Sequence, residues 1–340
     1  SGSIFNVNTG SVWLMNQQMD TIATPGRTCP LHYHYGPEVF RQAPAAALRD
    51  LEVLYVVGGL YGNESALLEI LRLFDAEQGR KRLVFNGDFH WFDADPARFA
   101  RVQQAVLAHT ALRGNVETEL ADPDPQGDAG CGCAYPDWVG DAVVERSNRI
   151  LRRLRGAVTP GQRAALSDLP MWLTAEVGDC RIGIVHGDAQ SLAGWGFAQE
   201  HLRDSSHRDR VRDWFHRGNV DAFASSHTCL PVFQRLGLGA HRAPGWVFNN
   251  GAAGMPNFRG DPAGLVTRIA VRPCEAKGSR ASVMHRGLHV DALAIEVDPA
   301  AVRLAFLAQW PAGTDAHASY FERIEGGPHY HPHQVIRQED

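Results

Sequence analysis

Apolar residues between positions 51 and 115 occur in short continuous runs that alternate with segments of helical periodicity. The runs are rich in Val and Leu and end near glycine, which is typical of buried strands. The segments between them repeat apolar residues every three or four positions. The pattern predicts strand, helix, strand, helix and strand over residues 51–59, 65–78, 81–88, 95–108 and 109–115. This order implies parallel strands joined by right-handed crossovers, with helices covering the sheet.

Strand-like runs dominate the rest of the chain. A loop rich in Asp, Gly and Pro covers residues 121–138, and a long helix is predicted for residues 139–157. Eight strands are expected after that helix, over residues 171–177, 180–188, 222–228, 231–237, 245–254, 265–271, 289–297 and 302–309. The polar end of the chain, residues 326–340, is expected to be loosely packed.

An α/β half followed by a strand-rich half indicates an α/β fold in which two sheets form a β-sandwich flanked by helices. We expect an irregular N-terminal arm over residues 1–50 and a single domain over residues 51–310. Within that domain, residues 121–170 form an insertion, and residues 311–340 form a C-terminal tail. A chain of 340 residues has ample material for such a core.

Composition narrows the class of protein. Hydrophobic residues make up 44% and charged residues 21%, and the formal net charge is -5 without a long basic run. Non-specific nucleic-acid binding is therefore not expected, and no apolar run approaches the length of a membrane span. The first 18 residues lack the basic and apolar regions of a signal peptide, so we expect a cytoplasmic protein. Its six cysteines are then expected to be reduced thiols.

Polar residues and glycines follow the predicted strands, and chemistry in open α/β sheets gathers at such strand ends. The segments are GGLYGN (58–63), NGDFHWFD (86–93), RGNVE (113–117), VHGD (185–188), SSHTC (225–229) and NNGAAGMP (249–256). In order and spacing this set resembles the calcineurin-like metallophosphoesterase superfamily. The likeness covers roughly residues 51–272 and is closest to the small bacterial phosphodiesterase and diadenosine-tetraphosphatase-like branch. It implies a four-layer αββα arrangement.

The resemblance also implies a site for two divalent metal ions that hold a phosphoryl group between them. Position by position, the chain keeps every ligand of the second metal, namely Asp88, Asn115, His186 and His227. The ligands that bind only the first metal are all replaced: Gly59 stands for Asp, Tyr61 for His and Cys229 for His. The resemblance therefore implies a site rebuilt around one metal. Its oxygen and nitrogen ligands suit Mn, Fe, Zn or Ni.

The same residue types have ordinary structural uses. An aspartate at a strand end can cap a turn, an asparagine can stabilise one, and a buried histidine can be satisfied by backbone groups. We nevertheless assign metal ligation to the four residues, and catalytic roles to Asp88 and His186. Arg113, just before the Gly-Asn segment, is the candidate for holding phosphate. Val116 stands where many superfamily members have a histidine as general acid, which favours a leaving group that needs little help.

Three further residues are possible additions to the site. Cys229 could be a small buried hydrophobe, a soft replacement ligand or a reactive thiol. Tyr61 could fill the space of the first metal with its ring, donate to a phosphate oxygen, or bind a ferric ion as phenolate. His90 and its neighbour Asp93 could help to rebuild the site or belong to a solvated loop.

Other clusters of metal-binding residue types lie outside these segments. Cys29, His32 and His34 could complete a site if the arm folds over its mouth, although an ordered surface arm is the simpler interpretation. Cys131 and Cys133 are too close for the usual zinc knuckle but could serve a metal or redox role in the insertion. The HYHPH segment of the tail binds metal in principle.

The leading hypothesis is a metal-dependent hydrolase that acts on a phosphoester or phosphoanhydride of a small phosphorylated molecule or nucleotide. One alternative is an inactive scaffold or binding protein on a degenerate fold, as in the retromer subunit that shares this architecture. Another is a rebuilt pocket in which Cys229 and Tyr61 perform different metal or thiol chemistry. The sequence leaves the substrate and the oligomeric state open.

Overall fold

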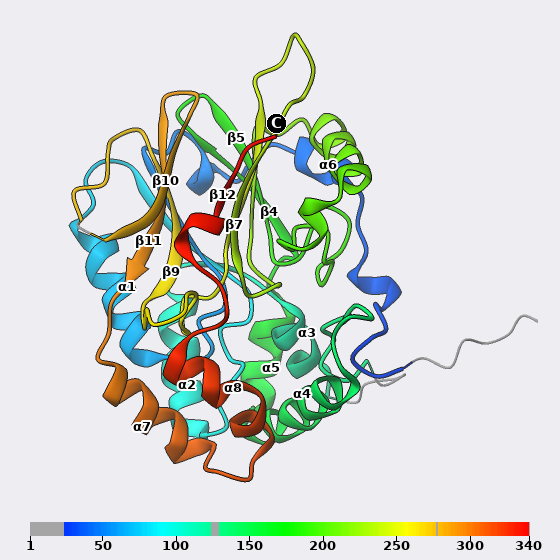
Figure 1. Cartoon of the computed structure of the whole chain (residues 1–340). Coiled ribbons are helices and arrows are strands. Elements are labelled where there is room, and N and C mark those ends of the chain that lie inside the picture. Colours follow the sequence, from blue (N-terminus) through cyan, green and yellow to red (C-terminus); the bar gives the residue numbers. More distant parts are fainter. Residues whose placement is uncertain (1–23, 124–128, 277, 340) are drawn as a thin grey trace, which may run out of the picture.

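Two six-stranded sheets form the centre of the protein in a computed structural model that describes residues 24–123, 129–276 and 278–339. The first sheet has the order β10-β11-β9-β1-β2-β3 and the second the order β12-β7-β8-β6-β5-β4. The first part of the expected arm, residues 1–23, lies outside the described residues. The expected α/β fold with a two-sheet sandwich is confirmed (Figure 1).

The first sheet contains the predicted parallel crossovers, because β1 pairs in parallel with β2, and β2 with β3. Its strands are β1 (Val53–Val57), β2 (Lys81–Asn86), β3 (Thr110–Leu112), β9 (Gly264–Ala270), β10 (Ser279–His285) and β11 (Leu288–Ile295). The strands of the second sheet are β4 (Trp172–Val177), β5 (Cys180–Val185), β6 (Ala222–Ser225), β7 (Pro231–Leu236), β8 (Gly245–Asn250) and β12 (Ile336–Arg337).

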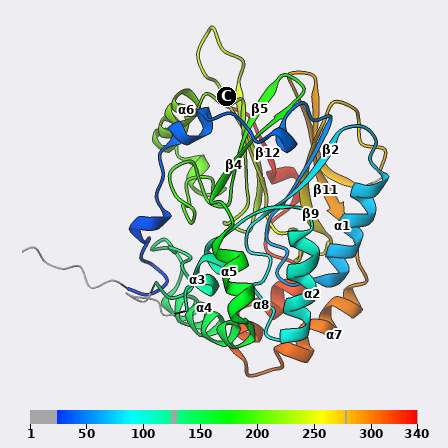
Figure 2. The same cartoon turned by 180° about the vertical axis from the view of Figure 1, so that it is seen from behind.

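Helices cover the outer faces of both sheets and the strand ends on one side (Figures 1 and 2). They are α1 (Glu64–Ala76), α2 (Pro96–Leu107), α3 (Asn115–Ala121), α4 (Asp141–Leu154), α5 (Pro160–Ser167), α6 (Ser205–Gly218), α7 (Pro299–Gln309) and α8 (Asp315–Gly326). Short 3₁₀ turns lie at η1 (Leu31–Tyr33), η2 (Pro37–Arg41), η3 (Ala46–Leu48), η4 (Arg155–Ala157), η5 (His201–Arg203) and η6 (Pro332–Gln334).

The alternation of side chains along buried strands produces the layers. In β1, Tyr55 packs in the cluster that contains residues of α1 and α2, whereas its neighbour Val56 packs in the cluster between the sheets. In β6, Ala224 belongs to the cluster between the sheets, and Phe223 packs with residues of α6. Because both faces of these strands are covered, their sequences are continuously apolar.

Two predictions about the end of the chain are wrong. Residues 302–309, expected as a strand, lie in α7, where Asp298 caps the helix and Pro299 occupies its first turn. Residues 326–340 are not loosely packed throughout: β12 pairs with β7, and Tyr330 is 2% exposed. The polar composition of this segment gave no indication that a few of its side chains, such as Tyr330, are buried. Among the described residues, no helix is long and apolar enough to cross a membrane.

Candidate metal centre

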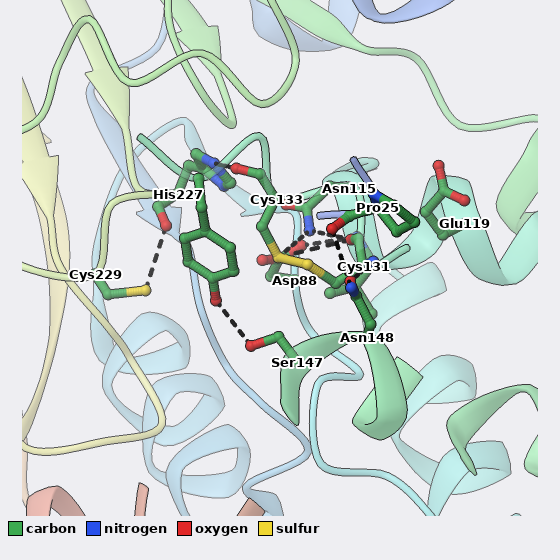
Figure 3. The surroundings of a disulfide bond; sticks show 12 residues. Pro25, Asp88, Asn115, Glu119, Cys131, Cys133, Ser147, Asn148, His227 and Cys229 are labelled. Atoms are coloured by element: carbon green, nitrogen blue, oxygen red, sulfur yellow. Dashed lines mark hydrogen bonds between the residues drawn. A yellow bond between two sulfur atoms is a disulfide. The ribbon is translucent and has the colours of Figure 1, made fainter. Parts of the chain in front are cut away.

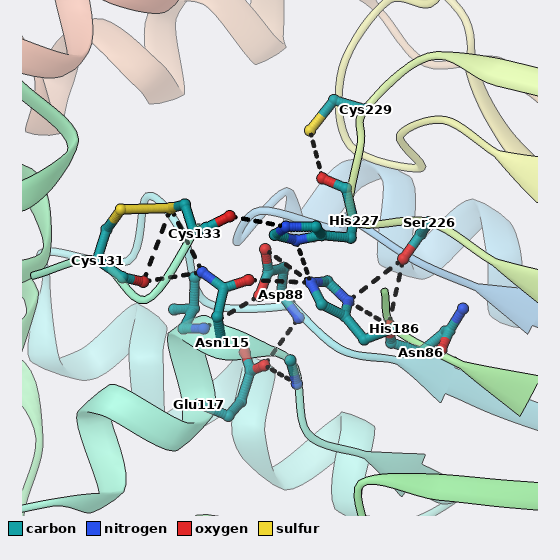
Figure 4. Close-up of polar contacts among 12 residues, drawn as sticks. Asn86, Asp88, Asn115, Glu117, Cys131, Cys133, His186, Ser226, His227 and Cys229 are labelled. Atoms are coloured by element: carbon teal, nitrogen blue, oxygen red, sulfur yellow. Dashed lines mark hydrogen bonds and ion pairs between the residues drawn. A yellow bond between two sulfur atoms is a disulfide. The ribbon is translucent and has the colours of Figure 1, made fainter. Parts of the chain in front are cut away.

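Four of the expected site residues converge where strands of the two sheets end (Figure 4). Asp88 follows β2, and Asn115 opens α3 directly after β3. His186 follows β5, and His227 follows β6. The first sheet thus supplies an aspartate and an asparagine, and the second supplies two imidazoles. All four are buried, with exposed fractions of 7% or less.

His186 Nε2 lies at the centre of the group. It is 3.3 Å from Asp88 Oδ2, 3.1 Å from Asn115 Oδ1 and 3.0 Å from His227 Nδ1. Asp88, His186 and His227 each offer a ligand atom within 4.8 Å of the others. Ligand atoms about 2.0–2.2 Å from one transition-metal ion lie roughly 3.0–3.5 Å from each other. The observed spacing therefore fits a single ion.

The hydrogen-bond partners of these residues fix which atoms face inward. His186 Nδ1 lies 2.9 Å from the Asn86 carbonyl, and His227 Nε2 lies 3.0 Å from the Cys133 carbonyl. A carbonyl only accepts, so these two nitrogens carry protons, and in the neutral form of each ring the opposite nitrogen presents a lone pair. Asn115 Nδ2 likewise donates to the Cys131 carbonyl at 2.9 Å, which turns Oδ1 toward His186.

Four acceptor atoms therefore point at one another. The donor groups of the same side chains bond to backbone carbonyls instead. Such an arrangement is electrostatically unfavourable unless a cation or a proton lies among them. Burial and the neighbouring His186 lower the pKa of His227 to about 3, so His227 is neutral near pH 7. Burial alone would raise the pKa of Asp88 and lower that of His186, but the attraction between the two groups lowers the pKa of Asp88 and raises that of His186. Without a metal ion, a proton on His186 Nε2 therefore lies among the acceptors, and a metal ion would displace it. A carboxylate and a neutral imidazole are the forms that bind a divalent ion.

Glu117 holds the two loops of the first sheet together at this site. Its carboxylate accepts from the backbone N–H groups of Asp88 at 2.7 Å, Phe89 at 3.0 Å and Gly114 at 2.9 Å. A side chain does not fit at Gly114, because a Cβ at this position would lie 2.3 Å from Asp88 Oδ1. These contacts give Glu117 a structural role at the site.

The Tyr61–Cys229 pair occupies the other half of the expected site. Tyr61 Oη lies 2.9 Å from Cys229 Sγ, and Cys229 Sγ donates to the His227 carbonyl at 3.3 Å. The Tyr61 ring fills the space below Gly59, where a Cβ would approach it to 2.9 Å. Burial raises the pKa of both the phenol and the thiol, so neither group is ionised near pH 7. Their atoms satisfy each other and do not leave a set of free lone pairs.

Two other candidates lie away from the group. The Arg113 guanidinium donates to the Ser167 carbonyl at 3.1 Å and does not line the cavity in front of the metal ligands. His90 is fully buried beneath the loop, where Nδ1 lies 2.7 Å from Asp93 Oδ2 and the ring stacks on Phe99. The structure therefore does not bring Arg113 or His90 to the candidate metal centre.

The clusters of metal-binding residue types in the arm and the tail do not join the group. His32 and His34 of the arm are exposed, and Cys29 Sγ lies 3.1 Å from Ser191 Oγ. His331 and His333 of the tail are exposed as well. Neither cluster belongs to the candidate metal centre.

The Cys131–Cys133 segment supports the site in a way that the sequence did not reveal. The two cysteines form a disulfide, contrary to the expectation of reduced thiols, and Figure 3 shows it beside Asn115 and His227. The Cys131 carbonyl accepts from Asn115, and the Cys133 carbonyl accepts from His227 and from Trp195 Nε1 at 2.9 Å. Backbone carbonyls leave no signature in a sequence, although the Cys-Gly-Cys spacing marks an unusual turn.

A cavity of about 240 Å³ opens in front of the group. Asp88, Asn115 and His227 line it, together with Tyr61 and Cys229. Aromatic and aliphatic side chains from the insertion and from α8 also line it, and they include Tyr135, Val139, Val143 and Tyr320. The candidate ligands are therefore buried but reachable from a pocket.

Comparison with known proteins supports the fold. The hypothetical protein PH1004 from Pyrococcus horikoshii aligns with 82% of this chain and 99% of its own, at a TM-score of 0.52 and 13% identity. A metallophosphoesterase from Sphaerobacter thermophilus aligns with 81% of this chain and 100% of its own, at a TM-score of 0.49 and 14% identity. The phosphoesterase Yfce from E. coli aligns with 64% and 87%, at a TM-score of 0.32 and 17% identity.

No protein-family profile and no curated protein matches the chain. The fold expected from the resemblance is confirmed, because PH1004 shares it over 82% of this chain. At these identities the likeness shows the fold alone, and the roles of the site residues remain predictions.

Proposed function

We propose that this protein is a metal-dependent hydrolase of phosphoesters that works with one divalent ion held by Asp88, Asn115, His186 and His227. The observation that carries the proposal is that three acceptor atoms, one each from Asp88, Asn115 and His227, lie 3.0–3.3 Å from His186 Nε2. Backbone carbonyls engage the Nδ2 group of Asn115, Nε2 of His227 and Nδ1 of His186. The phosphoester class rests on the order of the strand-end segments, which resembles that of the metallophosphoesterases.

A divalent ion at this position would supply Lewis-acid polarisation of a phosphoryl oxygen and would lower the pKa of a water molecule. The protein's own residues do the rest. Asp88 and the two imidazoles hold the charge in a buried place, where electrostatic interactions are strong. Asn115 is kept in one orientation by the Cys131 carbonyl. Val116 lines the cavity without offering a proton, so the leaving group departs without a side-chain acid at that position.

Turnover of an activated diester by the metal-loaded protein tests the proposal. Bis(4-nitrophenyl) phosphate would be offered with Mn²⁺, Zn²⁺, Fe²⁺ or Ni²⁺ to the parent chain, to Asp88→Asn and to a matched control, Asp137→Asn. Asp137 is exposed on the insertion and does not line the cavity. We expect metal-dependent turnover that falls by more than about 100-fold in Asp88→Asn and stays unchanged in the control. Equal turnover in the two variants would contradict the proposal.

The inactive-scaffold alternative has one observation in its favour, which is the filled half of the site at Tyr61 and Cys229. A protein that binds one metal ion but turns over no phosphoester would support that alternative. The intact group around His186 favours the hydrolase, because a scaffold gains nothing from four converging acceptors in a buried place.

A further inference from the structure

Aromatic and aliphatic side chains make up most of the lining of the cavity in front of the candidate metal centre. They include Tyr135, Val139, Val143, Trp91, Trp195 and Tyr320. The rings contact one another: Trp195 lies 5.9 Å from Tyr135 and 5.4 Å from His227, measured between ring centroids. An apolar ring that enters the cavity would therefore pack against other rings beside the metal ligands.

The polar groups of two of these rings are already bonded to the protein. Trp195 Nε1 donates to the Cys133 carbonyl at 2.9 Å, and Tyr135 Oη lies 3.0 Å from Ser147 Oγ. These two side chains thus present carbon surface to the cavity, while their donors stabilise its walls. A sugar or a nucleobase needs polar partners that they do not supply.

Within the described part of the chain, no lysine or arginine lines this cavity. Arg113 donates to the Ser167 carbonyl, and Arg323 donates to the carbonyls of Pro256 and Cys229. A chain of several phosphates carries charges that proteins neutralise with such cations. The cavity is suited to one phosphoryl group at the metal end and to an uncharged group beyond it.

The size of the cavity agrees with that division. A cavity of about 150 Å³ holds one benzene ring, whereas pockets for drug-sized ligands span about 300–1,000 Å³. The 240 Å³ here have room for a single ring and a phosphoryl group. Val116 also matters, since it offers no proton to a leaving group. An aryl oxide is a much weaker base than an alkoxide and leaves without that help.

We propose that the substrates of this site are aryl phosphoesters, with the aryl group held between Tyr135, Trp195 and Tyr320. The proposal rests on the proposed phosphoesterase function. In the reaction, the oxygen of water forms a bond to phosphorus while the bond between phosphorus and the aryl oxygen breaks. The aryl oxygen leaves with the bonding electron pair and takes a proton from solvent, and the proton lost by water also goes to solvent. No oxidant or reductant is required.

Binding of non-hydrolysable phosphonates to the metal-loaded full chain separates this proposal from the proposed function. Phenylphosphonate, methylphosphonate and adenosine monophosphate would be titrated by calorimetry, and tryptophan fluorescence would report on Trp91 and Trp195. We expect phenylphosphonate to bind at least ten-fold more tightly than the other two. Val143→Phe, which fills the cavity from the partly exposed start of α4, should abolish this preference. Ala142→Phe, at the exposed neighbouring position, should keep it.

Equal binding of phenyl and methyl phosphonates, or tighter binding of the nucleotide, would overturn the aryl proposal. If bis(4-nitrophenyl) phosphate were still hydrolysed in an Asp88-dependent way, the proposed function would survive that result. No binding of any phosphonate and no turnover by a protein that contains metal would sink both. A preference for phenylphosphonate that persists in Val143→Phe would also contradict the proposal, because the ring would then bind outside this cavity.

Discussion

The two halves of the candidate site contrast in how their polar atoms are satisfied. Around His186, three acceptor atoms lie 3.0–3.3 Å from Nε2, and backbone carbonyls engage the other polar atoms of Asn115, His227 and His186. Around Tyr61, the phenol and the Cys229 thiol bond to each other at 2.9 Å. A buried cation site can therefore be recognised by lone pairs that lack donors. Side chains that satisfy one another leave no such set of lone pairs.

The largest expected effect is the loss of metal from the His186 half. His186→Ala removes the atom at the centre of the group, and we expect the affinity for a divalent ion to fall by more than about 100-fold. His333→Ala, at an exposed position of the tail, is the matched control and should leave the affinity unchanged. Titration calorimetry measures both variants. Unchanged metal binding in His186→Ala would contradict the contrast between the two halves of the site.

Glu117 provides the next largest effect, because it fixes the two loops that present Asp88 and Asn115. Glu117→Gln keeps the size of the side chain but points an amide N–H₂ at backbone donors. We expect a loss of about 1–3 kcal/mol in the free energy of unfolding, measured by urea denaturation. Glu145→Gln, on the exposed face of α4, should change stability little. An equal loss in the two variants would show that Glu117 does not organise the site.

A third test of the His186 half of the site concerns the Cys131–Cys133 segment. The double variant Cys131→Ser/Cys133→Ser removes the disulfide that frames the carbonyls bonded to Asn115 and His227. We expect roughly a ten-fold loss of metal affinity, as is usual when partners of metal ligands are disturbed. Dithiothreitol should have the same effect on the parent chain and none on the double variant. Full affinity in the reduced parent would contradict this role.

A smaller effect concerns acid stability away from the site. Burial lowers the pKa of His285 to about 4, against about 6.5 in an unfolded chain. The unfolded state binds more protons between these values, so stability is complete above about pH 6.5 and is lost as the pH falls toward 4. His285→Gln should reduce this loss, with or without metal. The variant can still lose stability in acid. If bound metal prevents that remaining loss, the loss arises from the residues around His186. A variant as acid-sensitive as the parent would contradict the assignment.

The smallest effect is expected in the Tyr61 half. Tyr61→Phe and Cys229→Ala remove the bond between the two side chains but no lone pair from the group around His186. We expect metal affinity and turnover to change by less than about three-fold, as for packing residues. A loss as large as that in His186→Ala would show that Tyr61 or Cys229 binds a second metal.

The sequence predicted the parts of this account that depend on the order of segments. Glycines and polar residues at the ends of β2, β3, β5 and β6 indicated the four residues that meet around His186. The direction of a side chain was harder to predict, since Arg113 turns to the Ser167 carbonyl of the neighbouring insertion. Carbonyl contacts from residues 131 and 133 depend on a turn whose path only the structure shows. Residues 302–309 of α7 were predicted as a strand because they form an apolar run. The helix start at Asp298 and Pro299 was the signal in the sequence that indicated a helix.

Anomalous scattering from a crystal of the metal-loaded protein would test the central claim most directly. Data collected on both sides of the absorption edge of Mn or Zn locate each bound ion and count the ions per chain. The account predicts one peak, enclosed by His186 Nε2, His227 Nδ1, Asp88 and Asn115, with ligand distances of about 2.0–2.2 Å. A second peak between Tyr61 and Cys229, or no peak at His186 in a crystal that holds the ion elsewhere, would contradict it.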